Sequence, residues 1–179
     1  MSGGRSRREW GWRPLVDDWA ARIVESARVR PGELVLDIGA GEGALTGHLV
    51  DAGARVIAVE LHPGRSARLR ERFAGAPVTV VCADAVDLRL PRRPFRVVAN
   101  PPYHISSALL RTLLARHSKL AAADIVLQRA VVRRYAEGRG SDRWRRGYDA
   151  RQGLTVPRKA FHPPPRVDSA VLVLRRHSP

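Results

Sequence analysis

Cysteine, lysine and long hydrophobic runs are scarce in this sequence of 179 residues. The single cysteine, Cys82, excludes a disulfide within the chain and a zinc site built from cysteines, and we expect no bound metal. Cys82 ends an apolar run at 78–82, which indicates a thiol buried in a strand. The longest apolar runs are about as long as a strand, so we expect no segment that spans a bilayer.

A secretory signal peptide is also missing. Residues 1–13 are rich in arginine and glycine and have no apolar core, so we expect a cytoplasmic protein. The length suits one well-buried domain and is too short for two ordinary ones. We therefore expect a basic N-terminal tail at 1–13 and a single catalytic domain at 14–179, without a C-terminal domain.

Positive charge is what the chain has in excess. Its formal net charge is +15 and its pI is about 11.6, which favours a polyanionic partner, because each cation set against a phosphate releases counterions. Only Lys119 and Lys159 are lysines, and the arginine excess is also typical of a GC-rich genome. Between Gln128 and Arg166, eleven basic residues stand against three acidic ones, so the charge is clustered.

Apolar runs alternate with amphipathic segments along most of the chain, which predicts an α/β fold with a mostly parallel sheet and helices on both faces. We expect strands at 34–38, 56–60, 78–82, 96–99, 124–127 and 170–174, and helices at 14–29, 44–52, 65–73 and 105–115.

Small and polar residues follow three successive strands. Gly39 and Gly41 open a tight turn with Gly-x-Gly-x-Gly spacing, which differs from the spacing of dinucleotide binders. Glu60 ends the second strand, where a carboxylate can accept hydrogen bonds from ribose, and Asp84 follows the third, where it can accept from an adenine amino group. Because these strand ends meet at one edge of a parallel sheet, the pattern predicts a nucleoside cofactor site there.

The fourth strand leads directly into Asn100-Pro101-Pro102-Tyr103. The Asn100 amide oxygen and the Pro101 carbonyl can both accept from an amino group, such as N6 of adenine, and so aim its lone pair. The two prolines stiffen the loop, and Tyr103 offers a face for an unpaired base. This motif predicts a site that holds an amino nitrogen for methylation.

From about Pro14 to Leu174 the chain resembles the rRNA adenine N6-methyltransferases, which comprise the Erm macrolide-resistance enzymes and the small-subunit rRNA dimethyltransferases. The likeness is close in 34–45, 53–60, 68–73 and 91–103, and most specific in 156–171, which reads VPRKAFHPPPRVDSAV. It implies a Rossmann-like class I methyltransferase fold with S-adenosyl-L-methionine as cofactor.

The resemblance also implies roles for individual residues. Tyr103 and Phe161 would enclose the target base from opposite sides, next to Asn100 and Pro101. Glu60 would bind the ribose of the cofactor and Asp84 its adenine. The remaining cofactor contacts expected from the resemblance are Leu15, Gly39, Gly41, Leu61, Ala85 and Asn100.

The segment 89–98 looks more like the Erm enzymes of actinobacteria than like the housekeeping dimethyltransferases. That likeness implies methylation of an adenine in the peptidyl-transferase loop of 23S rRNA, with resistance to macrolides, lincosamides and streptogramin B. We expect a monomer whose partner is 23S rRNA before ribosome assembly is complete, and no membrane partner.

Two departures from the family pattern stand out. The Gln-Asn-Phe-Leu segment that lines the cofactor pocket in the family is replaced here by 11–15, which reads GWRPL, and the usual helical C-terminal domain does not follow the last strand. We therefore expect the basic N-terminus and the segment 139–151 to carry more of the RNA binding. The residues expected to contact RNA are Arg139, Arg143, Trp144, Arg145, Arg146 and Arg151.

Four other functions remain open. A small-subunit rRNA dimethyltransferase is the nearest of them. A DNA adenine methyltransferase shares the Asn-Pro-Pro-Tyr loop but not the segment 161–171, and a protein methyltransferase leaves the charge of +15 unexplained. An RNA-binding protein without activity would have no reason to keep Gly39, Gly41, Glu60, Asp84 and Asn100 together.

Overall fold

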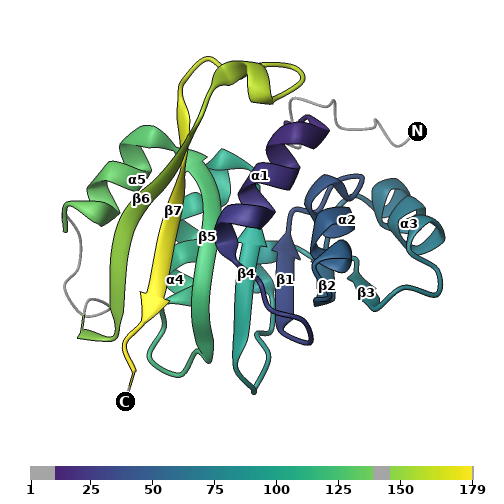
Figure 1. Ribbon diagram of the computed structural model, residues 1–179, viewed down its shortest axis with the longest axis horizontal. Coiled ribbons are helices and arrows are strands. Elements are labelled where there is room, and N and C mark those ends of the chain that lie inside the picture. The colour runs from purple at the N-terminus through teal and green to yellow at the C-terminus, as the bar shows by residue number, and fades with distance from the viewer. Residues whose placement is uncertain (1–10, 139–145, 179) are drawn as a thin grey trace.

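The computed structural model describes residues 11–138 and 146–178. Seven strands form one sheet in the order β3-β2-β1-β4-β5-β7-β6, with helices on both faces (Figure 1). The strands are β1 Leu34–Ile38, β2 Arg55–Val59, β3 Val78–Val81, β4 Phe95–Ala99, β5 Leu120–Gln128, β6 Tyr148–Val156 and β7 Ser169–Arg176. The helices are α1 Asp17–Ala27, α2 Ala44–Asp51, α3 Pro63–Arg72, α4 Ser106–Leu113 and α5 Arg129–Ala136, and three 3-10 turns lie at Ala85–Asp87, Tyr103–Ile105 and Arg158–Ala160.

Strands β1 to β5 run parallel, β7 runs against them, and β6, which is antiparallel to β7, has the same direction as the first five. Ile38 pairs in register with Val59 of β2, and Ala99 with Ile125 of β5, so the carboxyl ends of the parallel strands share one edge of the sheet. β7 pairs antiparallel with both β5 and β6, and its first residue, Ser169, therefore lies at this same edge. The loops that carry the predicted motifs all leave from it.

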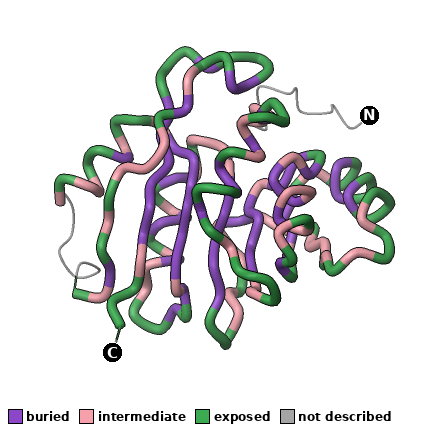
Figure 2. The backbone as a smooth tube through the Cα atoms, in the orientation of Figure 1, coloured by how far each residue is buried: buried purple, intermediate pink, exposed green. Residues whose placement is uncertain are grey.

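Two apolar clusters fill the spaces above and below the sheet. Alternate residues of β4, β5 and β7 face α4 and α5, while the residues between them face α1 and α2. Figure 2 shows the result as a buried centre of strands surrounded by exposed helix surfaces and loops. This burial on both faces is the reason that the central strands read as continuous apolar runs.

Two elements were not expected from the sequence. α5 fully buries only Val132 and carries three arginines among its eight residues. β6 is an edge strand without a regular alternation of polar and apolar residues, and its pairing with β7 shifts register between Gln152 and Thr155. The expectation of a buried thiol was wrong: Cys82 is exposed, because β3 ends at Val81 and the chain turns away from the sheet there.

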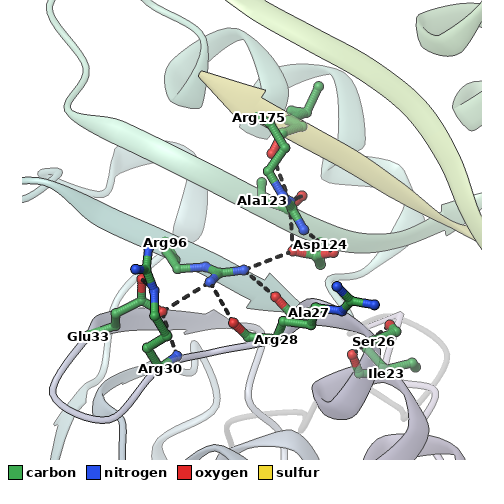
Figure 3. Close-up of polar contacts among 11 residues, drawn as sticks. Ile23, Ser26, Ala27, Arg28, Arg30, Glu33, Arg96, Ala123, Asp124 and Arg175 are labelled. Atoms are coloured by element: carbon green, nitrogen blue, oxygen red, sulfur yellow. Dashed lines mark hydrogen bonds and ion pairs between the residues drawn. The ribbon is translucent and has the colours of Figure 1, made fainter. Parts of the chain in front are cut away.

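A buried ionic network fastens α1 to the sheet on the face that α1 covers (Figure 3). Arg96 of β4 donates to the carbonyl oxygens of Ala27 and Arg28 at the carboxyl end of the helix, at 2.5 and 3.2 Å. The same guanidinium lies 3.0 Å from Glu33 and 3.6 Å from Asp124 of β5. Asp124 is 1% exposed and also accepts two bonds from Arg175 of β7.

None of the helices in residues 11–138 and 146–178 combines the length and the apolar character that crossing a membrane requires.

Candidate active site

A cavity of about 410 Å³ opens at the carboxyl edge of the parallel strands. It runs from the ends of β1, β2 and β3 to the loop after β4, so one space joins the predicted cofactor side to the predicted acceptor side. The expected site residues that line it are Gly39, Glu60, Leu61, Asp84, Ala85, Asn100, Pro101 and Tyr103. Lining residues that were not among the predicted contacts include Gly11, Trp12 and Arg13, from the segment that replaces Gln-Asn-Phe-Leu, and also Arg65 and His104.

Gly39 is where the turn after β1 meets the acceptor loop. Its φ is +77°, and a Cβ at this position would lie 3.2 Å from both Pro101 Cα and Pro102 Cδ. A side chain would therefore strain the backbone and push the Asn-Pro-Pro loop away from the turn. Besides lining the cavity, this glycine sets the distance between the two halves of the site.

Glu60 is 4% exposed, and three donors of the protein bind its carboxylate. Its Oε2 accepts from Gly41 N–H at 2.8 Å, while Oε1 accepts from His62 N–H at 2.8 Å and from Arg65 Nη2 at 3.1 Å. A carboxylate offers about four acceptor positions, so roughly one remains for a ligand hydroxyl. Glu60 thus fixes the glycine turn to the start of α3 as well as facing the cavity.

Two aspartates follow or end the neighbouring strands on the cofactor side. Asp37, at the end of β1, is 1% exposed and accepts from Thr46 Oγ1 at 2.6 Å. Burial raises the pKa of Asp37 to about 7, with the hydrogen bond from Thr46 opposing the shift and the charge of Glu60 adding to it. Asp84 accepts from Val86 N–H through Oδ1 and lines the cavity wall near Ala85.

Asn100 is held by a backbone group far away in the sequence. Its Nδ2 donates to the Arg13 carbonyl oxygen at 2.9 Å. Only the amide nitrogen can donate to a carbonyl, so this bond determines which way the amide is turned. Oδ1 is consequently the amide atom left to accept a hydrogen bond from a ligand.

Tyr103 is held at both its backbone and its hydroxyl. Its carbonyl accepts from Ser106 Oγ at 2.7 Å, and its hydroxyl forms a 2.5 Å hydrogen bond with Ser169 Oγ at the start of β7. Burial raises the pKa of Tyr103, partly offset by Ser169 and by the charge of Arg13, so the phenol stays neutral. The Ser169 contact ties the acceptor loop to the far end of the segment 156–171.

Replacing Ser169 with alanine is expected to lower kcat/KM for RNA by about ten-fold, because the half-buried phenol loses its partner and the ring its fixed plane. Tyr103→Phe should lower kcat/KM by a similar factor, and the double variant should lower it no further than Ser169→Ala alone. Initial rates at low RNA concentration measure this, with thermal unfolding as the check on folding. Losses that simply add would contradict the coupling.

The segment Gly11–Val16 crosses the site. Pro14 C=O accepts from His162 N–H at 3.0 Å, and Val16 N–H donates to Ala160 C=O at 2.8 Å. Leu15 forms an isolated antiparallel bridge with Phe161. Residues 11–13, which were expected to belong to the basic N-terminal tail, thus line the cavity.

Three predicted site residues do not line the cavity. Leu15 and Phe161 are 7% and 2% exposed and pack in the cluster between α1 and the sheet. Gly41 is covered by Trp12. The structure thus brings Tyr103 into the cavity without Phe161, and the enclosure of a base between the two rings stays a prediction.

The predicted RNA contacts are divided. Arg139, Arg143, Trp144 and Arg145 lie outside the described residues, whereas Arg146 and Arg151 are exposed. Arg146 precedes β6, whose Tyr148 hydroxyl donates to Leu120 at the amino end of β5, so Arg146 lies at the opposite edge of the sheet from the cavity. Exposed cations on the cavity edge are instead Arg129, Lys159 and Arg166.

The sheet order, the glycine turn after β1 and the cavity at the carboxyl edge define a Rossmann-like methyltransferase, a fold that uses S-adenosylmethionine. The family model described as ribosomal RNA adenine dimethylase matches residues 7–179. The chain belongs to this family.

Several relatives agree with this assignment. Ribosomal RNA small subunit methyltransferase A of Leifsonia xyli subsp. xyli is 38% identical over 88% of this chain. The rRNA adenine N-6-methyltransferase of Corynebacterium diphtheriae is 35% identical over 97% of this chain. The crystal structure of the 23S rRNA methyltransferase ErmE matches with a TM-score of 0.83 and 35% identity over 92% of this chain. The chain spans 61%, 70% and 70% of these three proteins, respectively.

Proposed function

We propose that this protein transfers a methyl group from S-adenosylmethionine to N6 of an adenine in rRNA. The observation that carries the proposal is the single cavity that contains both the Gly39–Glu60–Asp84 side and the Asn100–Tyr103 side. A cofactor on the first side and a base on the second would place the two reacting atoms in one enclosed space.

The residues fit this chemistry. S-adenosylmethionine supplies a methyl group on a positively charged sulfonium. Asn100 Oδ1, turned by its bond to Arg13, and the Pro101 carbonyl would accept from the two N6 hydrogens, and these bonds strengthen as positive charge develops on N6. After the nitrogen–carbon bond forms and the carbon–sulfur bond breaks, the surplus proton on N6 leaves to water. Tyr103 would hold the base by stacking.

The acidic groups on the cofactor side fit the polar groups of the cofactor. Glu60 and Asp84, which line the cavity, would accept hydrogen bonds from its hydroxyl and amino groups, while the surface of a chain whose net charge is +15 attracts RNA. The exposed Arg129, Lys159 and Arg166 on the same edge would contact phosphates next to the target adenine.

For the finer target we propose an adenine in the peptidyl-transferase region of 23S rRNA, with macrolide-lincosamide-streptogramin B resistance as the consequence. Support comes from the 23S rRNA methyltransferase ErmE, which is 35% identical and matches over 92% of this chain. The second candidate is an adenine of the small-subunit rRNA, favoured by the 38% identity to methyltransferase A.

Mass spectrometry of both rRNAs from cells with and without the gene is expected to show added methyl groups on 23S adenine only. Primer extension on each rRNA locates the site, because dimethylated adenine stops reverse transcriptase. Cells that express Asn100→Ala are the control for modification by other enzymes. Modified small-subunit rRNA with unmodified 23S rRNA would select the second candidate, and two unmodified rRNAs would reject both.

A further inference from the structure

Trp12 and Arg65 form a closed set of contacts with the glycine turn. Trp12 Nε1 lies 2.5 Å from where a Cβ of Gly41 would stand, so the indole packs directly on the bare backbone of the turn. The Arg65 guanidinium lies over the Trp12 ring, 4.7 Å from its centroid. Arg65 also forms an ion pair with Glu60 at 3.1 Å, and Glu60 accepts a hydrogen bond from Gly41 N–H at 2.8 Å. Trp12, Arg65, Glu60 and Gly41 are therefore joined in a ring of contacts.

Three of these four residues face the cavity, and the fourth lies behind Trp12. Trp12, Glu60 and Arg65 line the cavity, and Gly41 is the part of the turn that Trp12 separates from it. The Arg65 and Glu60 side chains are 9% and 5% exposed, so their charges are largely withdrawn from water, and they hold each other in place. Such an arrangement gives Trp12 a fixed position, unlike an indole resting on an open surface.

The same short segment reaches the acceptor side. The carbonyl oxygen of Arg13, next to Trp12, accepts a hydrogen bond from the Asn100 amide. Gly11 lies so close to Pro102 that a Cβ on Gly11 would be 3.0 Å from the proline Cβ. A displacement of Trp12 would therefore also disturb the group that orients the Asn100 amide.

We propose that the Trp12 indole, clamped by Arg65, is the wall of the cofactor pocket over the glycine turn and a determinant of cofactor affinity. S-adenosylmethionine then lies against Trp12 and Gly39 and not against Gly41. Arg65 acts as a positioning residue, because it holds both Trp12 and the Glu60 carboxylate. This inference rests on the cofactor of the proposed function, and it assigns that cofactor two contacts.

Calorimetric titration of the purified protein with S-adenosylmethionine and with S-adenosylhomocysteine, without RNA, tests the proposal. Trp12→Ala is expected to raise both dissociation constants by about ten-fold or more, and Trp12→Phe, which keeps an aromatic wall, by less. Arg65→Lys keeps the charge but loses the planar stack, so it should weaken binding as well. Trp12→Ala/Arg65→Lys should bind no more weakly than Trp12→Ala, since both changes break one clamp.

The chain provides a matched control. Trp19 and Arg22 on α1 form a second Trp–Arg stack, with the guanidinium carbon 5.0 Å from the ring centroid, and neither residue lines the cavity. Arg22→Lys should therefore leave both dissociation constants unchanged. Thermal unfolding without cofactor confirms that each variant is folded, and Arg65→Lys tests the clamp independently should Trp12→Ala not fold.

Unchanged dissociation constants in folded Trp12→Ala and Arg65→Lys would overturn the proposal, because Trp12 would then only pack on the turn. Tighter binding by Trp12→Ala would also overturn it, since the indole would be occupying space that the cofactor needs. Absence of cofactor binding by the unmodified protein would reject the cofactor and the proposed function together with this inference. The two failures are therefore distinguishable.

Discussion

Asn100→Ala is expected to lower kcat for adenine methylation by about 100- to 1000-fold, the cost typical of removing one preorganised polar group that acts on the developing charge. The physical reason is that the amide oxygen accepts from N6 more strongly as that nitrogen becomes positive. The measurement is single-turnover transfer of labelled methyl from saturating S-adenosylmethionine to rRNA. Retention of more than about a tenth of the activity would contradict the role of Asn100.

Asn100→Asp separates orientation from the mere presence of an acceptor. The carboxylate keeps an oxygen in place of Oδ1, but it cannot donate to the Arg13 carbonyl 2.9 Å away, so two oxygens would repel each other there. We therefore expect Asn100→Asp to be nearly as inactive as Asn100→Ala. Full activity of the aspartate variant would show that the bond to Arg13 is dispensable.

Arg96→Met is expected to lower the free energy of unfolding by about 3–5 kcal/mol, since it removes one member of a buried charge network. The substitution leaves the carbonyl oxygens of Ala27 and Arg28 without their guanidinium partner. Glu33 keeps only Arg30, and Asp124 keeps only Arg175. Urea unfolding monitored by circular dichroism measures the change. Arg68→Met is the matched control, because the Arg68–Glu42 pair is exposed and should contribute less than about 1 kcal/mol.

The same network predicts how the free energy of unfolding depends on pH. Partial burial works to raise the pKa of Glu33, but the hydrogen bond from Arg30 N–H and the charge of Arg96 outweigh it, and the pKa is lowered from 4.5. A carboxylate with a lowered pKa contributes stability above its unfolded value and loses it as the pH falls through the folded value. The difference in the free energy of unfolding between wild type and Arg96→Met should therefore become smaller below about pH 4.5. If this difference stays constant down to pH 3, Glu33 is excluded as its source.

Much of the fold followed from local patterns. The apolar runs at 34–38 and 96–99 became β1 and β4 to within one residue, because strands buried on both faces are apolar along most of their length. The run at 78–82 became the edge strand β3, also to within one residue, although Thr79 is exposed there. α5 and β6 escaped prediction because both lie at the edge of the sheet, where polar side chains are tolerated. The apolar residues that α5 and β6 pack against lie in other elements, so the pattern within each segment alone does not reveal them.

The network around Arg96 shows the same limit for charged residues. Arg96 and Asp124 stand within strands and gave no sign of burial, since each is compatible with an exposed strand end. Only the packing of α1 across the sheet brings the carbonyls of Ala27 and Arg28 onto Arg96. A charged side chain can be buried only where oppositely charged or hydrogen-bonding groups surround it, and the tertiary structure determines which groups those are.

By itself the sequence determined the α/β class, the glycine turn at Gly39 and the placement of Glu60, Asp84 and Asn100 at strand ends, because each of these follows from spacing along one strand–turn unit. Only the tertiary structure decided how the two halves of the site meet. It set Trp12 and Arg13 between the glycine turn and Asn100, and it placed Ser169 against Tyr103 across 66 residues. These contacts join segments that have no common period or motif, so packing alone brings them together.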